Sequence, residues 1–182
     1  MPSQVAEETI YITLRDGRKI VARPTDRNID RETVYNFRVE CGWDMDKVDD
    51  WFDMVENGLR LEYLAIGEDG EPVGMIALDL EDMHYKDVEV ASRATKTGCV
   101  ASLYIAKSKR KGGAALALIE YLEVQAKANG VERITMNTLP HNATSRHIFE
   151  SLGYKKFKEG LRYKDPFSEE VLEAVYYRKQ IQ

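Results

Sequence analysis

A short basic loop, Arg110–Ala115, has the composition best suited to ligand binding in this sequence. Gly112 and Gly113 carry no Cβ, so a ligand can approach the backbone closely there. A helix is expected directly after the loop, and its first amides have no partners within the helix. Those amides and the helix dipole favour an anion, and Lys107 and Lys109 add positive charge beside them. The loop therefore predicts a pyrophosphate site, with a basic connection that binds nothing as the alternative.

The expected order of elements places this loop between a strand and a helix. The strand runs from Cys99 to Ala106 and is almost entirely apolar. The helix has an apolar face at helical spacing, formed by Ala115, Leu118, Ile119, Leu122 and Ala126. A strand from Val131 to Asn137 and a short helix capped by Asn142 follow. Because a helix links two strands here, the sequence predicts a parallel strand pair.

The remaining elements are expected to be mostly strands. A hairpin turn is expected at Asp16-Gly17, because glycine accepts a positive φ at little cost. Two helices are expected next, one capped by Asp30 and one from about Asp46 to Asn57. The other expected strands are Thr9 to Leu14, Lys19 to Arg23, Leu61 to Ile66, Val73 to Leu80, Tyr154 to Tyr163 and Val171 to Ile181. Together these elements predict a mixed α/β sheet.

Composition and charge limit the classes of protein to consider. The chain has 182 residues, with no repeat and no linker, so we expect one domain over residues 1–182 with a core from about 19 to 181. Acidic residues number 31 against 26 basic ones, and the net charge of −5 argues against nucleic-acid binding. No apolar run approaches the roughly 18 residues of a membrane span. Met1 to Thr9 lacks the apolar core of a secretory signal, so we expect a cytoplasmic protein.

The loop and its strand resemble the GCN5-related N-acetyltransferase (GNAT) superfamily. The pyrophosphate loop of that family follows the pattern Arg/Gln-x-x-Gly-x-Gly/Ala, and Arg110, Gly113 and Ala115 match its fixed positions. The family has an aliphatic residue five positions before the arginine, where this chain has Ile105. Lys107 replaces a proline that is common in the family.

A second match lies downstream of the next expected strand. Family members often have Asn-x-x-Ala, then an aromatic residue, then glycine and another aromatic residue. This chain has Asn142 to Ser145, then Phe149, then Gly153-Tyr154, with Ser145 in place of the usual alanine. The resemblance implies a GNAT fold, an α/β class with a mixed, twisted sheet of about seven strands and about four helices. The hairpin at the start of the chain adds an extra N-terminal strand to that fold.

The resemblance also implies acetyl-CoA as cosubstrate, with no metal. In the family, backbone groups of the strand before the loop pair with the pantetheine arm, and the loop amides hold the pyrophosphate. The corresponding residues here are Leu103, Tyr104, Ile105, Arg110, Lys111, Gly112, Gly113, Ala114, Ala115, Asn142 and Ser145. Asn142 could equally be a helix cap without contact to the coenzyme.

The implied reaction is direct transfer of the acetyl group to a primary amine of a small molecule. The tyrosine that often acts as general acid in the family is replaced by Phe149, which cannot donate a proton. Candidates for the general base follow the strand that ends near Leu80, and they are Asp79, Glu81, Asp82 and His84. Of these we select Glu81 and His84 as catalytic residues, although they could be solvent-facing residues of a polar hairpin. That stretch, Glu81 to Gly98, contains Val88 and Val90, which could extend a hairpin.

Two other functions stay open from the sequence. One is acetylation of a protein or peptide amine, and the other is a non-catalytic module that senses acyl-CoA. The two cysteines, Cys41 and Cys99, have no metal-ligand spacing and are expected to be buried apolar residues in a reducing compartment. A homodimer is also open, because the strand from Val171 to Ile181 could pair with a second subunit.

Overall fold

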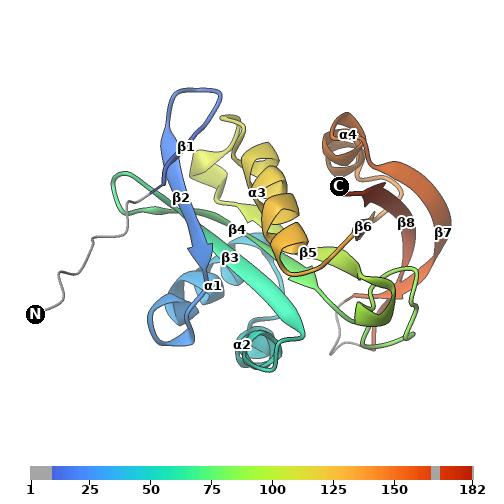
Figure 1. Cartoon of the computed structure of the whole chain (residues 1–182). Helices are drawn as coiled ribbons and strands as arrows, with labels where there is room; N and C mark the ends of the chain where they lie inside the picture. The colour runs from blue at the N-terminus through green and yellow to red at the C-terminus, as the bar shows by residue number, and fades with distance from the viewer. Residues whose placement is uncertain (1–9, 165–168, 182) are drawn as a thin grey trace, which may run out of the picture.

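An eight-stranded sheet organises the chain, and the computed structural model describes it over residues 10–164 and 169–181 (Figure 1). The strands are β1 Ile12–Thr13, β2 Lys19–Pro24, β3 Arg60–Gly67, β4 Pro72–Asp79, β5 Thr97–Ile105, β6 Arg133–Thr138, β7 Lys155–Tyr163 and β8 Val171–Gln180. The helices are α1 Arg27–Cys41, α2 Val48–Glu56, α3 Ala114–Ala128 and α4 Ala143–Ser151, with 3₁₀ turns at Met45–Lys47, Arg93–Thr95 and Lys107–Lys109. The strand order is β1-β2-β3-β4-β5-β6-β8-β7, which confirms the expected mixed α/β sheet with an extra N-terminal strand.

Helices cover both faces of the sheet (Figure 1). On one face α3 and α4 share a core cluster with residues of the sheet such as Tyr63 and Ala65 of β3. On the other face α1 and α2 pack against Leu64, which points the opposite way because side chains alternate along a strand. All neighbouring strands are antiparallel except β5 and β6, which are parallel as expected because α3 connects them.

The segment between β4 and β5 covers part of the same face as α1 and α2. It contains no strand among its described residues, and one isolated bridge, Ser92 to Thr97, is its only ladder contact. Val90 is buried against Cys99, whereas Val88 is half exposed. The sequence-based extension of a hairpin by these two valines is therefore wrong, because Val90 packs onto the sheet instead of pairing with it.

The start of α1 also differs from the sequence-based prediction. The helix begins at Arg27, and the side chain of Asp26 caps it by accepting the N–H of Asn28 at 2.8 Å. Asp30, the expected cap, is buried inside the first turn, where Arg23 donates to it at 2.7 and 2.8 Å. The expected cap of α4 is confirmed, because Asn142 Oδ1 accepts the N–H of Ser145 at 3.2 Å.

The end of the chain closes the sheet in an order that the sequence did not reveal. β8 lies between β6 and β7 and pairs with both. β8 is therefore an inner strand of the sheet, paired on both sides from Val175 to Arg178, so it is not a free edge for pairing with a second subunit as the sequence suggested. The expected start of the first strand at Thr9 lies outside the described residues. No helix in the described part of the chain is long and apolar enough to span a membrane.

Candidate active site

The pairing between β5 and β6 covers only the first third of β5. The last paired residues are Cys99 and Thr135, whereas β5 stays paired with β4 as far as Ile105 and Gly74. From Val100 onward, the edge of β5 that faces β6 has no ladder partner among the described strands. Such an edge can bind an extended ligand as an added strand. The predicted pantetheine contacts Leu103, Tyr104 and Ile105 all lie on this open segment.

A β-bulge interrupts β5 within the same open segment. The register with β4 shifts between Met75 and Ala77, opposite Ser102. Ser102 has a φ of 51°, which non-glycine residues rarely adopt, and it therefore lies at the irregular point of the bulge. Nη2 of Arg60 donates to Ser102 Oγ at 2.6 Å and holds the bulge from the side of β3.

The predicted pyrophosphate loop connects β5 to α3. Lys111 and Gly113 both have positive φ, 72° and 91°, and Gly113 is the N-cap of α3 with no side-chain cap bond. The first amides of α3 are therefore available to an anion. Arg110 turns back toward the strand, where its Nε donates to the carbonyl of Ile105 at 3.0 Å and its guanidinium lies 5.3 Å from the ring of Tyr104. Arg110, the arginine of the family motif, therefore fixes the conformation of the loop by its contacts with β5.

The hairpin between β1 and β2 packs against the same loop. Arg18 donates to the carbonyl of Lys109 at 2.9 Å, and a Cβ on Gly112 would lie 2.1 Å from both Arg18 Nη2 and Asp16 Oδ2. The close approach that the sequence assigned to a ligand at Gly112 is made here by the chain itself. Arg15 reaches the carbonyl of Lys111 at 3.5 Å, so two arginines from the hairpin add positive charge beside the loop.

Glu40 of α1 fixes the end of β5. The hydroxyl of Tyr104 donates to Glu40 Oε2 at 2.8 Å, and the N–H of Lys107 donates to Glu40 Oε1 at 3.3 Å. Burial, followed by the hydrogen bond to Glu40, raises the pKa of Tyr104 to about 12. This contact could not be predicted from the sequence, because Glu40 lies on a helix far from the loop in the chain.

A cavity of about 410 Å³ opens beside the unpaired part of β5, on the face of the sheet that carries α1 and α2. Acidic and aromatic side chains make up much of its wall, and Val100, Ala101 and Ser102 bring β5 into it. The acids and the rings are Asp44, Asp79, Glu81, Asp82, Trp43, Trp51, His84, Tyr85, Tyr163 and Tyr176. A volume of this size falls within the range for small-molecule sites, about 300–1,000 Å³.

The two predicted catalytic residues, Glu81 and His84, both line this cavity. Glu81 Oε1 accepts the N–H of Arg93 at 3.1 Å. The ring of His84 stacks on Tyr163 with a centroid distance of 4.0 Å. Asp82 accepts the N–H groups of the turn that follows, including that of His84 at 3.2 Å, so it organises the turn.

Asp79 lies at the end of β4 and ends a buried polar network. Nη1 of Arg60 donates to its Oδ1 at 2.8 Å, and the side chain of Asp79 is 16% exposed toward the cavity. Arg60 itself is fully buried, pairs with Glu62 at 2.8 Å and lies 4.0 Å from the ring of Trp51. Burial raises the pKa of Asp79, Arg60 opposes that rise, and the net direction is upward.

Phe149 and Cys99 are buried as expected, whereas Cys41 is only partly buried, because it lies at the end of α1 with its thiol donating to the carbonyl of Arg38. Phe149 is 2% exposed, packs edge-on against Tyr154 at 5.0 Å and does not line the cavity. The usual position of the general acid is therefore part of the core under α3. Burial raises the pKa of Cys99 to about 12 and also raises that of Cys41, so neither thiolate is favoured at neutral pH. Within residues 10–164 and 169–181, no group of three or more potential ligands could hold a metal ion.

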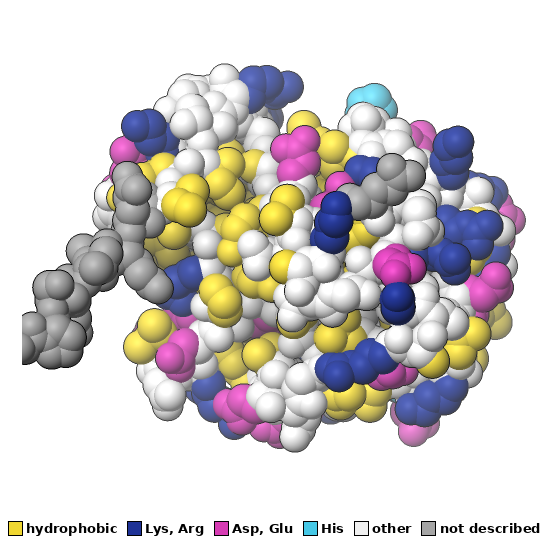
Figure 2. Space-filling view, in the orientation of Figure 1, with side chains coloured by type: hydrophobic (Ala, Val, Ile, Leu, Met, Phe, Trp, Pro, Cys, Tyr) yellow, Lys and Arg dark blue, Asp and Glu magenta, His cyan; other side chains and the backbone are white. Residues whose placement is uncertain are grey.

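The opposite face of the molecule carries α3 and the start of the pyrophosphate loop. Hydrophobic side chains gather over the middle of that face, and many Lys and Arg side chains lie toward β7 and β8 (Figure 2). The open edge of β5 lies between the two faces. A ligand that pairs with β5 can therefore have its phosphates at α3 and its reactive end in the cavity on the far side.

The sequence and the fold match a known family. The model of the acetyltransferase (GNAT) family matches residues 28–154, which is most of the chain, so the chain belongs to this family. It is an N-acetyltransferase, and acetyl-CoA is its acetyl donor. The open edge of β5 and the uncapped start of α3 are suited to that donor, because they offer a strand edge and an anion site.

Solved structures of similar fold come from several bacteria. An N-acetyltransferase from Staphylococcus aureus has a TM-score of 0.69 at 16% identity, with 90% of this chain and 99% of that one covered. The protein yncA from Salmonella typhimurium, solved with its cofactor acetyl-CoA, has a TM-score of 0.68 at 15% identity, covering 90% and 94%. Spermidine N-acetyltransferase from Vibrio cholerae, solved with CoA and spermine, has a TM-score of 0.66 at 12% identity, covering 89% and 95%. No protein with curated annotation matches the chain in sequence.

Proposed function

We propose that this enzyme transfers the acetyl group of acetyl-CoA to a primary amine of a small molecule. The observation that supports this acceptor class is the cavity of about 410 Å³ beside the open edge of β5. Its volume suits a small molecule, and its acids and aromatic rings suit an alkylammonium group. A structural neighbour of similar fold, the Vibrio cholerae enzyme, was solved with the polyamine spermine.

The donor is held by the residues that the sequence selected. The backbone of Leu103, Tyr104 and Ile105 would pair with the pantetheine arm, and the amides of Arg110–Ala115 would hold the pyrophosphate. Asn142 and Ser145 lie at the start of α4 and would contact the coenzyme from the β6 side. Glu81 and His84 line the acceptor cavity and are candidates to accept the proton of the amine.

A thiol-release assay tests this function. Purified protein is mixed with acetyl-CoA and, separately, with polyamines, arylalkylamines, amino acids and short peptides, and free CoA is measured over time. We expect steady CoA release with at least one small primary amine and a matching acetylated product by mass spectrometry. Release with peptides alone would contradict the small-molecule acceptor and leave only a protein or peptide acceptor.

A further inference from the structure

We infer that Asp79 is the group that accepts the proton of the acceptor amine. The inference rests on the proposed transfer to a small amine and assigns its proton acceptor.

Asp79 lies where the cavity meets the point at which the strands separate. It is the last residue of β4, and its register partner is Cys99, the last residue of β5 that still pairs with β6. The next residues of β5, Val100 and Ala101, line the cavity together with Asp79. The carboxylate is therefore close to the start of the open edge and faces the space proposed for the amine.

The other acids near this point are engaged by the backbone of the loop. Asp82 accepts N–H groups from His84 and Asp87, at 3.2 and 3.1 Å, and Glu81 accepts the N–H of Arg93. Asp79 makes no such bond, and within the described part of the chain Arg60 is its only hydrogen-bond partner, through Oδ1. Oδ2 of Asp79 therefore has no donor among the described residues.

Arg60 holds Asp79 and the β5 bulge with the same guanidinium. Nη1 donates to Asp79 Oδ1 at 2.8 Å, Nη2 donates to Ser102 Oγ at 2.6 Å, and Nε donates to Glu62 Oε2 at 2.9 Å. The side chain is 0% exposed and its face lies against Trp51. Because the guanidinium is planar and all its contacts are internal, the carboxylate has one fixed position relative to the bulge.

The charges around Asp79 suit a proton acceptor. The groups that act on it electrostatically are Arg60 and Glu62 of β3, Asp82 after β4 and the thiol of Cys99 on β5. The other charged or titratable side chains that line the same cavity are Arg38, Asp44, Glu81, His84, Tyr85, Arg162, Tyr163, Lys164 and Tyr176. Burial raises the pKa of Asp79, Arg60 lowers it, Glu62 and Asp82 raise it, and the net direction is upward. A carboxylate with a raised pKa takes a proton more readily near neutral pH.

The amine nitrogen, with its lone pair free, forms a bond to the thioester carbonyl carbon. The C–S bond then breaks, and its electron pair leaves with sulfur as the CoA thiolate. The proton that the nitrogen loses goes to the carboxylate of Asp79, and from there to the thiolate or to solvent.

The test compares Asp79→Asn with the wild type, using the most active amine of the panel above. Asparagine keeps an oxygen for Arg60 but cannot accept the proton. We expect kcat at pH 7 to fall at least about 100-fold, with a smaller loss at pH 10, where hydroxide can accept the proton in place of Asp79. Binding of CoA, measured by calorimetry, should not change. Asp30→Asn is the matched control, since Asp30 is also a buried acid paired with an arginine, but outside the cavity.

A second variant covers the case in which Asp79→Asn does not fold. Glu62→Gln removes a negative charge that raises the pKa of Asp79, so the acid limb of the kcat profile should move to lower pH. An unmoved limb overturns the inference. Wild-type kcat at pH 7 in Asp79→Asn overturns it as well. The inference is also overturned if Glu81→Gln or His84→Ala loses the acid limb of the kcat profile while Asp79→Asn keeps it. If no amine is acetylated although CoA binds, the proposed acceptor class fails, and this role of Asp79 fails with it.

Discussion

Arg60 Nη2 donates to Ser102 Oγ at 2.6 Å, which joins a fully buried arginine of β3 to the bulge of β5. The same guanidinium pairs with Glu62 and Asp79. We predict that Arg60→Ala lowers the free energy of unfolding by about 3–5 kcal/mol, because two buried carboxylates lose their cation. Urea unfolding at pH 7 measures this loss, and the loss should shrink at pH 5, where a carboxylate left unpaired and buried is protonated more readily.

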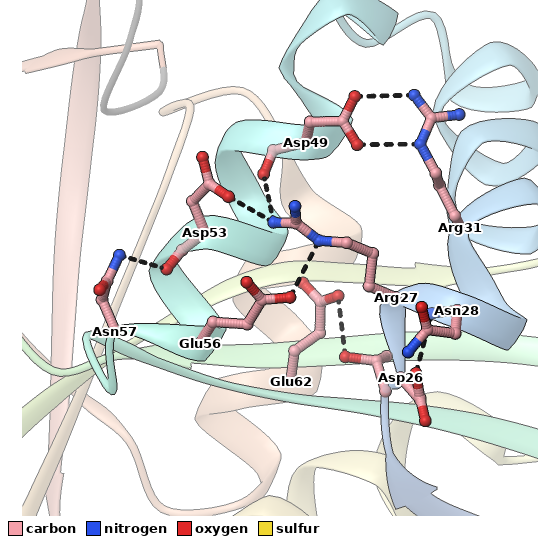
Figure 3. Close-up of polar contacts among 10 residues, drawn as sticks. Asp26, Arg27, Asn28, Arg31, Asp49, Asp53, Glu56, Asn57 and Glu62 are labelled. Carbon is pink, nitrogen blue, oxygen red and sulfur yellow. Dashed lines mark hydrogen bonds and ion pairs between the residues drawn. The ribbon is translucent and has the colours of Figure 1, made fainter.

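Arg31→Ala is the control for that prediction. Arg31 pairs with Asp49 between α1 and α2 through two hydrogen bonds, at 2.8 and 2.7 Å (Figure 3). Both side chains are more than half exposed, so solvent and salt screen the pair. The unfolding midpoint of Arg31→Ala should match that of the wild type. An equal loss of unfolding free energy in both variants would show that the buried Arg60 network contributes no more to stability than an exposed ion pair does.

Phe149→Tyr should cost stability without adding a general acid. The ring is 2% exposed and packs on Tyr154 in the core beneath α3. A hydroxyl added there would be buried, and without a partner it costs about 1–3 kcal/mol. We expect a lower melting temperature and no rise in kcat. A rise in kcat with unchanged stability would show that this position faces the CoA thiol.

Acid should weaken the first turn of α1 through Asp30. Burial alone would raise the pKa of Asp30, but hydrogen bonds from Arg23 and from the N–H of Asp26 hold the pKa below its usual value. A lowered folded-state pKa means that the carboxylate contributes stability above its unfolded pKa and loses it as the pH falls through the folded value. Unfolding free energy measured from pH 6 down to pH 2 should fall less steeply in Asp30→Asn than in the wild type. Parallel curves would contradict the prediction.

The parts of this site that lie together in the sequence could be predicted from it. Arg110–Ala115 follows β5 directly and opens α3, so its loop, its helix start and its family pattern were all visible in one short segment. Asn142 was predicted as a cap for the same reason, since a cap bonds only to the next few residues. The order β5, α3, β6 around the loop could be predicted from this local pattern.

The acceptor side could be predicted only in part. Asp79, Glu81 and His84 lie close together in the sequence and were named as candidates, and all three line the cavity. The residues that hold Asp79 could not be predicted, because they meet it only through the sheet. Arg60 and Ser102 are 42 positions apart, and Arg60 looks like an ordinary charged residue at the start of a strand. For Gly112 the sequence indicated a close approach but not the neighbour that makes it. Its small size was assigned to a ligand, but the structure uses it to admit Asp16 and Arg18 of a hairpin far away in the chain. Sequence patterns reveal that close packing is needed and do not reveal what packs there.

Gly113→Ala should weaken coenzyme binding much more than it weakens the fold. Gly113 has a φ of 91° at the N-cap of α3, and a Cβ there would lie 3.4 Å from Cβ of Arg15. Alanine in this conformation costs about 1–2 kcal/mol, and relief of that strain would turn the first amides of α3 away from the anion. Since a hydrogen bond to a charged group contributes about 1.5–3 kcal/mol, we expect CoA affinity to fall at least about tenfold by calorimetry.

Gly70→Ala separates the loss of the anion site from general backbone strain. Gly70 has a φ of 80° in the turn between β3 and β4, and a Cβ there meets no atom within 4 Å. The two variants therefore carry similar strain, and their melting temperatures should fall by similar amounts. Only Gly113→Ala should lose CoA affinity, because only that residue begins α3. If both variants bind CoA as tightly as the wild type, the pyrophosphate is not held by the first amides of α3.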